Sequence, residues 1–105
     1  MIRILPNADR AGEYILWDGD VACGKACAQF DDRVHILSVE APDELLAEGM
    51  VRAVLNAGRV REIETAVCAN EALFPLLKRL EFMPCDEGMT VSIPDFFFRG
   101  CQCHG

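Results

Sequence analysis

The stretch from residue 34 to residue 82 constrains the fold more than any other part of the chain. Its pattern predicts a strand at 34–39, a helix from about residue 42 to 61, a strand at 65–68 and a helix from 70 to about 80. A break signal separates each element from the next. Strands that alternate with helices favour βαβ crossovers, which place their strands parallel. This segment therefore predicts an α/β domain with at least one parallel pair of strands.

The long helix has a one-sided apolar pattern. Its apolar residues recur at helical spacing, namely Leu46, Met50, Ala53, Val54 and Ala57. Acidic residues stand in the early turns and arginines near the end, an order that suits the helix dipole. Asn70 is a favourable N-cap for the second helix, and Pro75 predicts that this helix begins or bends at that point.

Antiparallel strands are predicted before this segment. Residues 2–5, 13–17 and 21–30 fit strands, and the last two are joined by the turn Asp18-Gly19-Asp20. A final strand is predicted at 91–93, stopped by Pro94. The fold class is therefore α/β (α+β), a single domain over residues 1–105. Its mixed sheet is an antiparallel β-meander of four strands, followed by helix, strand, helix and strand.

Composition and charge exclude several classes of function. The 105 residues carry a net charge of −7, which would repel phosphate backbones and anionic membranes. Neither nucleic acid nor a membrane is therefore an expected partner. No apolar run approaches the ~20 residues of a spanning helix, and the amino terminus lacks the form of a signal peptide. The expected location is the cytoplasm, where the six cysteines would be reduced thiols.

The first candidate group of metal ligands is the pair Cys23 and Cys27. On a regular strand their sulfurs share a face but lie ~13 Å apart at ~3.3 Å per residue, too far to bind one ion. Only a bulge at Gly24 would bring them together. These cysteines are therefore interpreted as structural.

The second candidate group lies in the tail. Cys101, Cys103 and His104 fall within four positions, and a zinc site there would need a fourth ligand such as Cys85 or one from a second subunit. A frayed, exposed end is the simpler interpretation. We predict no metal site, and a metal- or thiol-dependent sensor built on this tail is an alternative.

Three other features have structural interpretations. His35 stands in an apolar strand and is interpreted as a core histidine rather than a base. Glu40 lies at the end of that strand, where α/β sheets place site residues, but a solvated turn carboxylate is the commoner explanation. The run Phe96-Phe97-Phe98 is expected to pack on the sheet or on a second subunit, because exposure would invite aggregation.

Four pieces of residues 34–82 resemble the second half of the GNAT superfamily, the acyl-CoA N-acyltransferases. They are the strand Ile36-Leu37-Ser38-Val39, the helix containing residues 49–55, the strand Thr65–Cys68, and residues 70–82, which are similar to the family's Asn-x-x-Ala … Leu-Tyr-x-Lys-x-Gly-Phe ending. With the hairpin before them they cover about three quarters of the chain. The resemblance implies a GNAT-like domain that binds acetyl-CoA. Main-chain groups of Leu37, Ser38 and Val39 would hold its pantetheine arm, and Asn70 would contact the coenzyme.

The chain departs from the family pattern at the diphosphate-binding loop. The family's Arg/Gln-x-x-Gly-x-Gly/Ala loop should follow Val39, where backbone N–H groups and a helix N-terminus hold the CoA diphosphate. Residues 40–48 contain neither the basic residue nor the glycine pair. Asp43 and Glu44 would lie where the diphosphate binds, and carboxylates beside a diphosphate lower its affinity.

Three further departures concern catalysis and architecture. The tyrosine that often protonates the departing thiolate in the family is Leu77, which cannot act as a general acid. Glu81 stands where the family has a glycine, directly before the closing phenylalanine Phe82. The family's first two helices have no room, because a single short turn separates Leu5 from Tyr14.

These departures favour a GNAT-like domain that has lost acyl-CoA transfer and serves as a binding or assembly module. Without the first two helices, part of one sheet face should lack cover, and we expect a homodimer to supply it. The alternatives are an active acetyl-CoA-dependent N-acyltransferase and the tail-based sensor. A small-molecule ligand is compatible with each, and the sequence indicates neither a catalytic base nor an acceptor substrate.

Overall fold

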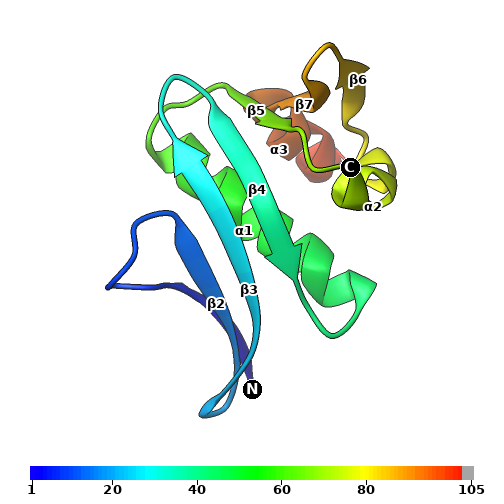
Figure 1. Cartoon of the computed structure of the whole chain (residues 1–105). Helices are drawn as coiled ribbons and strands as arrows, with labels where there is room; N and C mark the ends of the chain where they lie inside the picture. Colours follow the sequence, from blue (N-terminus) through cyan, green and yellow to red (C-terminus); the bar gives the residue numbers. More distant parts are fainter. Residues whose placement is uncertain (103–105) are drawn as a thin grey trace.

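The computed structural model describes residues 1–102, with side chains as far as residue 98. Seven strands form one mixed sheet in the order β1-β2-β3-β4-β5-β7-β6 (Figure 1). The strands are β1 (Ile2–Pro6), β2 (Glu13–Asp18), β3 (Val21–Phe30), β4 (Val34–Glu40), β5 (Thr65–Cys68), β6 (Met83–Cys85) and β7 (Gly88–Ser92). The helices are α1 (Glu44–Val60), the 3-10 turn η1 (Glu71–Leu73), α2 (Phe74–Arg79) and α3 (Ile93–Gln102).

The predicted succession of strand, helix, strand and helix over residues 34–82 is confirmed. Strands β1 to β4 form the antiparallel meander, and β4 and β5 are parallel across the α1 crossover. Pro75 stands at the start of α2, where its missing N–H costs nothing. The buried face of α1 is rotated slightly from the predicted stripe and consists of Met50, Val51, Val54, Leu55 and Gly58.

The end of the chain differs from the prediction. The last strand is β7, and it pairs with β6, which the sequence pattern did not reveal. A three-residue strand is too short to show a periodicity. Pro94, expected to stop the strand at 91–93, stands instead in the first turn of α3, a position that proline tolerates.

Helix α3 packs against α1 through its phenylalanines. Phe96 is buried, and its ring meets that of Phe97 edge to face with centroids 5.2 Å apart. The guanidinium groups of Arg52 and Arg59 lie over these two rings, at 5.3 and 4.7 Å from the centroids. Phe98 remains 61% exposed. The run of phenylalanines thus packs on helix α1, and α3, which carries it, also contacts strand β7 of the sheet.

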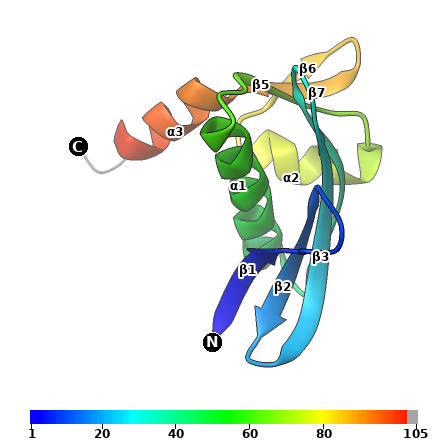
Figure 2. The same ribbon diagram turned by 90° about the vertical axis from the view of Figure 1, so that its left-hand side faces the viewer.

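One face of the meander is covered and the other is open. Helix α1 lies against the face that carries Leu16, Ala26 and Ile36, all of which are buried (Figure 2). Because side chains alternate along a strand, Ile15, Trp17 and their neighbours point to the opposite face. No helix of the described part of the chain covers that face.

Within residues 1–102, no helix is long and apolar enough to cross a membrane.

Replacing Glu62 with glycine is expected to raise the free energy of unfolding by about 1 kcal/mol. Glu62 follows the end of α1 with φ 62, and the N–H of Ile63 donates to the Gly58 carbonyl across it at 2.9 Å. This is a helix ending that favours glycine at the left-handed position. Urea unfolding would measure the change. Glu64→Gly is the control, because Glu64 has a negative φ, and that variant should lose stability.

Candidate functional site

The sheet opens between β4 and β5. These strands pair only at Val34↔Ala66 and His35↔Val67, and the rest of β4 continues without β5 beside it (Figure 1). A β-bulge lies at this point of β4. Cys27 of β3 pairs with Ser38 and the next residue, Ala28, pairs with Ile36, so Leu37 has no partner residue in β3. A bulge bends its strand and increases the local twist. The bend carries the lower half of β4 away from β5.

A cleft of about 330 Å³ occupies this opening. Its lining residues are His35, Ile36, Leu37, Val67, Ala69, Asn70 and Glu87. Leu37 is 51% exposed, which is high for a leucine in an inner strand. Ser38 and Val39, which the resemblance also assigns to coenzyme binding, follow in β4 and are half-buried.

Asn70 ties the two sides of the cleft together. Its Nδ2 donates to the Leu37 carbonyl at 3.0 Å, and its Oδ1 accepts from the Ala72 N–H at 3.1 Å. The predicted N-cap is thus present, on η1 rather than on a full helix. The structure also brings together Leu37 and Asn70, although 33 positions separate them in the sequence. As a result, the carbonyl of the bulged residue already has a partner.

The N-terminus of α1 is occupied by carboxylates. Asp43 caps the helix, and its Oδ1 accepts from the Leu46 N–H at 2.8 Å. Arg79 of α2 is paired with Glu44, and its Nη2 lies 3.4 Å from Glu48 Oε1. One helix amide is thus bonded to a side-chain anion of the chain itself, and a diphosphate there would meet negative charge.

The positions that replace the family's tyrosine and glycine have different environments. Leu77 is fully buried in the core. Glu81 keeps the left-handed backbone that glycine favours, with φ 67, and the N–H of Phe82 donates to the Leu77 carbonyl at 2.9 Å. The helix ending is therefore preserved in shape, whereas position 77 holds an apolar core side chain.

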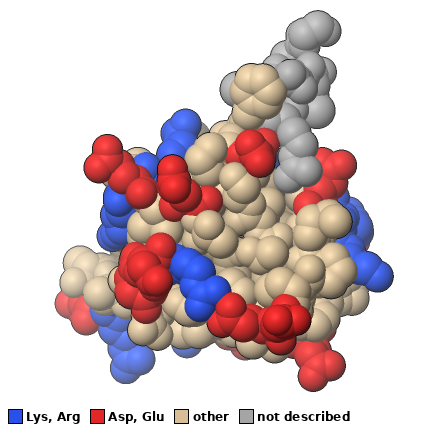
Figure 3. Space-filling view, turned by 90° about the horizontal axis from the view of Figure 1, so that it is seen from above, with Lys and Arg blue, Asp and Glu red and all other residues tan. Residues whose placement is uncertain are grey.

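The upper end of the cleft carries an ion pair and a histidine. Arg33 meets Glu87 in a two-pronged contact, with Nη1–Oε1 at 2.5 Å and Nη2–Oε2 at 2.9 Å, which joins the β3–β4 turn to the β6–β7 turn. The prediction that His35 is a core histidine is wrong. Its side chain is half-buried at the cleft wall, and its Nε2 lies 3.1 Å from Asp31 Oδ1. Figure 3 views this end of the molecule and shows acidic and basic side chains interspersed over it.

These contacts shift the titration of two carboxyl groups. The hydrogen bonds from Arg33 lower the pKa of Glu87 below its ordinary value and raise the pKa of Arg33. The backbone N–H of Arg33 lowers the pKa of Asp31, with further lowering from Asp32 and His35. Both carboxylates are therefore charged at neutral pH.

Glu87→Gln should lower the urea midpoint at pH 7, and the difference from the parent should shrink as the pH falls below the ordinary glutamate value of 4.5. A depressed folded-state pKa contributes stability above the unfolded-state value, and that stability is lost as the pH falls through the folded-state value. Asp86→Asn removes a charge from the same turn and is the control, since among the described residues no ion pair involves Asp86. A midpoint difference that stays constant from pH 7 to pH 3 would contradict this account.

The two cysteines of the predicted pair lie in different surroundings. Strand β3 has a bulge at Cys23, whose Sγ lies 3.6 Å from the Leu16 carbonyl, while Cys27 points to the open face. No group of three ligating side chains within the described residues includes a cysteine, and the group that does form is Asp31, Asp32 and His35. Cys103 and His104 lie outside the described residues, as does the side chain of Cys101.

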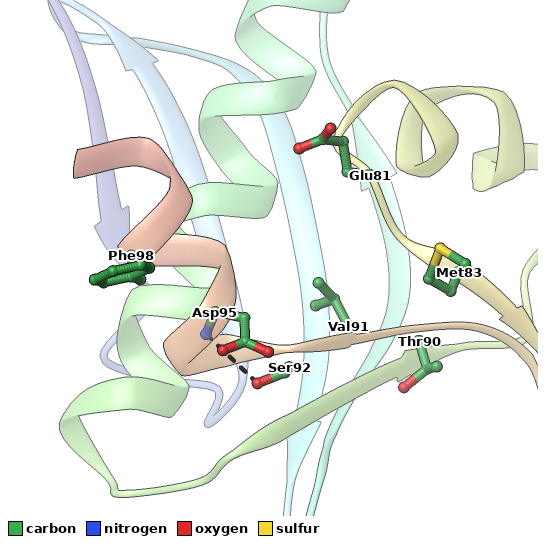
Figure 4. Close-up of a pocket in the computed structure, with 7 residues that line it drawn as sticks. All are labelled: Glu81, Met83, Thr90, Val91, Ser92, Asp95 and Phe98. Carbon is green, nitrogen blue, oxygen red and sulfur yellow. Dashed lines mark hydrogen bonds between the residues drawn. The ribbon is translucent and has the colours of Figure 1, made fainter. Parts of the chain in front are cut away.

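A second hollow, of about 420 Å³, lies between α3 and the β6–β7 hairpin. Figure 4 shows its lining residues, with the carboxylates of Glu81 and Asp95 on different sides of Val91. The Ser92 Oγ accepts from the Asp95 N–H at 3.4 Å. None of these residues was predicted as a site. The hollow forms only because β6 and α3, which the sequence pattern did not reveal, lie on either side of β7.

Comparisons by sequence find no relative: no protein-family model matches the chain, and no curated protein sequence does. Comparisons of structure do find similar folds. The ribosomal-protein-S18-alanine N-acetyltransferase from Escherichia coli superposes with a TM-score of 0.62 over 77% of this chain and 68% of that protein, at 15% identity. The NatC complex bound to Gag peptide and CoA gives a TM-score of 0.60 over 74% of this chain and 66% of its own, at 14% identity.

A putative acetyltransferase of the GNAT family from Desulfovibrio desulfuricans gives a TM-score of 0.60 over 77% of this chain and 68% of its own, at 12% identity. The chain therefore spans about two thirds of each of these structures. At such identities the likeness concerns the fold. The antiparallel meander, the α1 crossover and the opening between β4 and β5 together give this chain a GNAT-like fold.

Proposed function

We propose that this GNAT-fold domain does not transfer acyl groups and serves as a binding and assembly module. The observation that carries the proposal is the occupied N-terminus of α1. The Asp43 carboxylate takes the Leu46 N–H, and Glu44 and Glu48 stand in the following turns. A coenzyme diphosphate bound there would displace an internal cap and approach three carboxylates, which is unfavourable on both counts.

Titration calorimetry with acetyl-CoA tests the proposal. We expect no saturable binding, with a Kd above about 1 mM. The matched variant is Asp43→Ser with Glu44→Gln, in which serine can still cap the helix while two negative charges are removed. That variant should bind acetyl-CoA more tightly than the parent. Micromolar binding by the parent would overturn the proposal.

A second candidate function is an active N-acyltransferase. The observation that favours it is the opening beside the bulge at Leu37, which provides an unpaired strand edge and an exposed apolar wall. In that function the main-chain groups of Leu37, Ser38 and Val39 would hold the pantetheine arm of acetyl-CoA, and Asn70 would contact it. The calorimetric titration separates the two functions directly.

We further propose that the module assembles as a homodimer through the open face of the meander. That face carries Leu5, Ile15 and Trp17 without a covering helix among the described residues. Its charged residues balance, since by register it also carries the basic residues Arg3 and Lys25 and the acidic residues Glu13 and Glu40. A neutral face on a chain of net charge −7 can meet its own copy without repulsion.

Light scattering at micromolar concentration should give the mass of a dimer. Trp17→Lys should reduce it to that of a monomer, because the substitution places a charge within the apolar face. Leu45→Lys changes an exposed leucine of α1 and should leave the dimer intact. A monomer mass for the parent protein would refute the assembly.

The four described cysteines are free thiols, which supports the cytoplasm as the proposed compartment.

A further inference from the structure

We infer that the cleft between β4 and β5 binds an extended, basic polypeptide segment of a partner protein, which pairs with the free edge of β4. This inference rests on the proposed loss of acyl-CoA transfer. It names the class of partner that the binding module would recognise. Three properties of the cleft support it: an unpaired strand edge, an apolar wall and negative charge at both ends.

Strand β4 is an inner strand of the sheet, yet part of its edge toward β5 has no strand paired with it. Past the pair His35↔Val67, the remaining residues of β4 have no strand on the β5 side within the described chain. An antiparallel partner such as β3 uses the backbone groups of alternate residues, so the other N–H and C=O groups face the cleft. The Leu37 carbonyl is bonded to Asn70, which leaves the edge beyond it available. At about 3.3 Å per residue, residues 38–40 offer an edge of roughly 10 Å, enough to pair with about three residues of a bound segment.

The walls of the cleft suit alternate side chains of such a strand. Leu37 is exposed, and Ile36 and Val67 form the apolar base. A strand added here would turn every second side chain toward the cleft wall and the others toward solvent. Apolar residues at alternate positions would therefore cover Leu37.

Charge selects a basic segment. At the upper end, the three carboxylates of Asp31, Asp32 and Glu87 outnumber the single guanidinium of Arg33. At the lower end, the carboxylates of Asp43, Glu44 and Glu48 likewise outnumber the guanidinium of Arg79. A segment with lysines between its apolar residues is attracted to both ends, whereas a diphosphate is repelled.

The test is a titration of the full chain followed by amide NMR. The probe is a capped peptide of about seven alternating valine and lysine residues. Two control peptides replace lysine with glutamate, or carry N-methyl groups on the backbone and so cannot donate to β4. Binding by the first peptide should slow the hydrogen exchange of one β4 amide beyond Leu37, namely the Ser38 or Val39 amide that faces the cleft rather than β3. Neither control peptide should saturate.

Leu37→Lys puts a positive charge on the cleft wall at an exposed position and should weaken binding at least about tenfold. Val60→Lys makes the same change at the exposed end of α1, away from the cleft, and should bind as the parent does. No binding of the valine-lysine peptide, or equal binding by the Leu37→Lys variant, would overturn the inference while leaving the loss of acyl transfer intact. Micromolar binding of acetyl-CoA by the parent, with competition for the peptide, would overturn the proposed function instead.

Discussion

Replacing Gly58 with alanine is expected to lower the free energy of unfolding by about 2 kcal/mol, although alanine is the better helix former. A Cβ at this position would lie 2.5 Å from Val34 Cγ2 and 3.1 Å from Ile93 Cδ1. Val34 is fully buried and β-branched, so its χ1 has little freedom to turn the methyl group aside. Helix α1 would have to move away from β4, and the contact with the start of α3 would loosen. Urea unfolding at constant slope measures the loss.

Gly49 provides the matched control within the same helix. Its Cβ would meet only Ile4 Cδ1, at 3.5 Å, which is an ordinary contact. Gly49→Ala should therefore stabilise the protein, by up to about 1 kcal/mol from helix propensity. Equal effects of the two substitutions would show that α1 does not approach the sheet as closely as described at Gly58.

Leu77→Tyr should fail to create an acyltransferase and should lower the free energy of unfolding by about 3 kcal/mol or more. Position 77 corresponds to the family's general acid by resemblance, yet the Leu77 side chain is fully buried in the core. A larger ring would overpack that core, and its hydroxyl would be buried without a hydrogen-bond partner. Urea unfolding gives the stability, and the acetyl-CoA titration gives the binding.

Leu77→Met is the control, because it conserves volume and should cost less than about 1.5 kcal/mol. If the tyrosine variant were as stable as the parent, its hydroxyl would have to reach the cleft or solvent. A tyrosine at position 77 could then serve as a general acid. The proposal that this domain does not transfer acyl groups would lose one of its supports.

The order of elements over residues 34–82 followed from the sequence because each signal there is local. Helical spacing in α1, the N-cap at Asn70 and the early Pro75 act within a turn or two of the chain. The negative charge at the N-terminus of α1 could also be predicted from the sequence, because Asp43 and Glu44 are adjacent to the start of that helix. These local signals predicted the order of elements on which the resemblance to the GNAT fold depends, and the acidic start of α1 is the basis of the proposed loss of diphosphate binding.

The end of the chain could not be predicted in the same way. Strand β6 has three residues and exists because β7 pairs with it, so its signal lies in a partner rather than in itself. Pro94 was equally ambiguous, since proline both stops a strand and begins a helix. The second hollow depends on these two elements and was missed with them.

The sequence by itself determined the strand and helix order, the antiparallel meander and the acidic start of α1, because neighbouring residues specify them. Only the tertiary structure decided the opening of the cleft. The bulge at Leu37 appears when β3 and β4 are aligned, and the Asn70 contact with its carbonyl joins segments 33 positions apart. Register and long-range hydrogen bonds depend on which segments meet, and that information does not lie in any single stretch of chain.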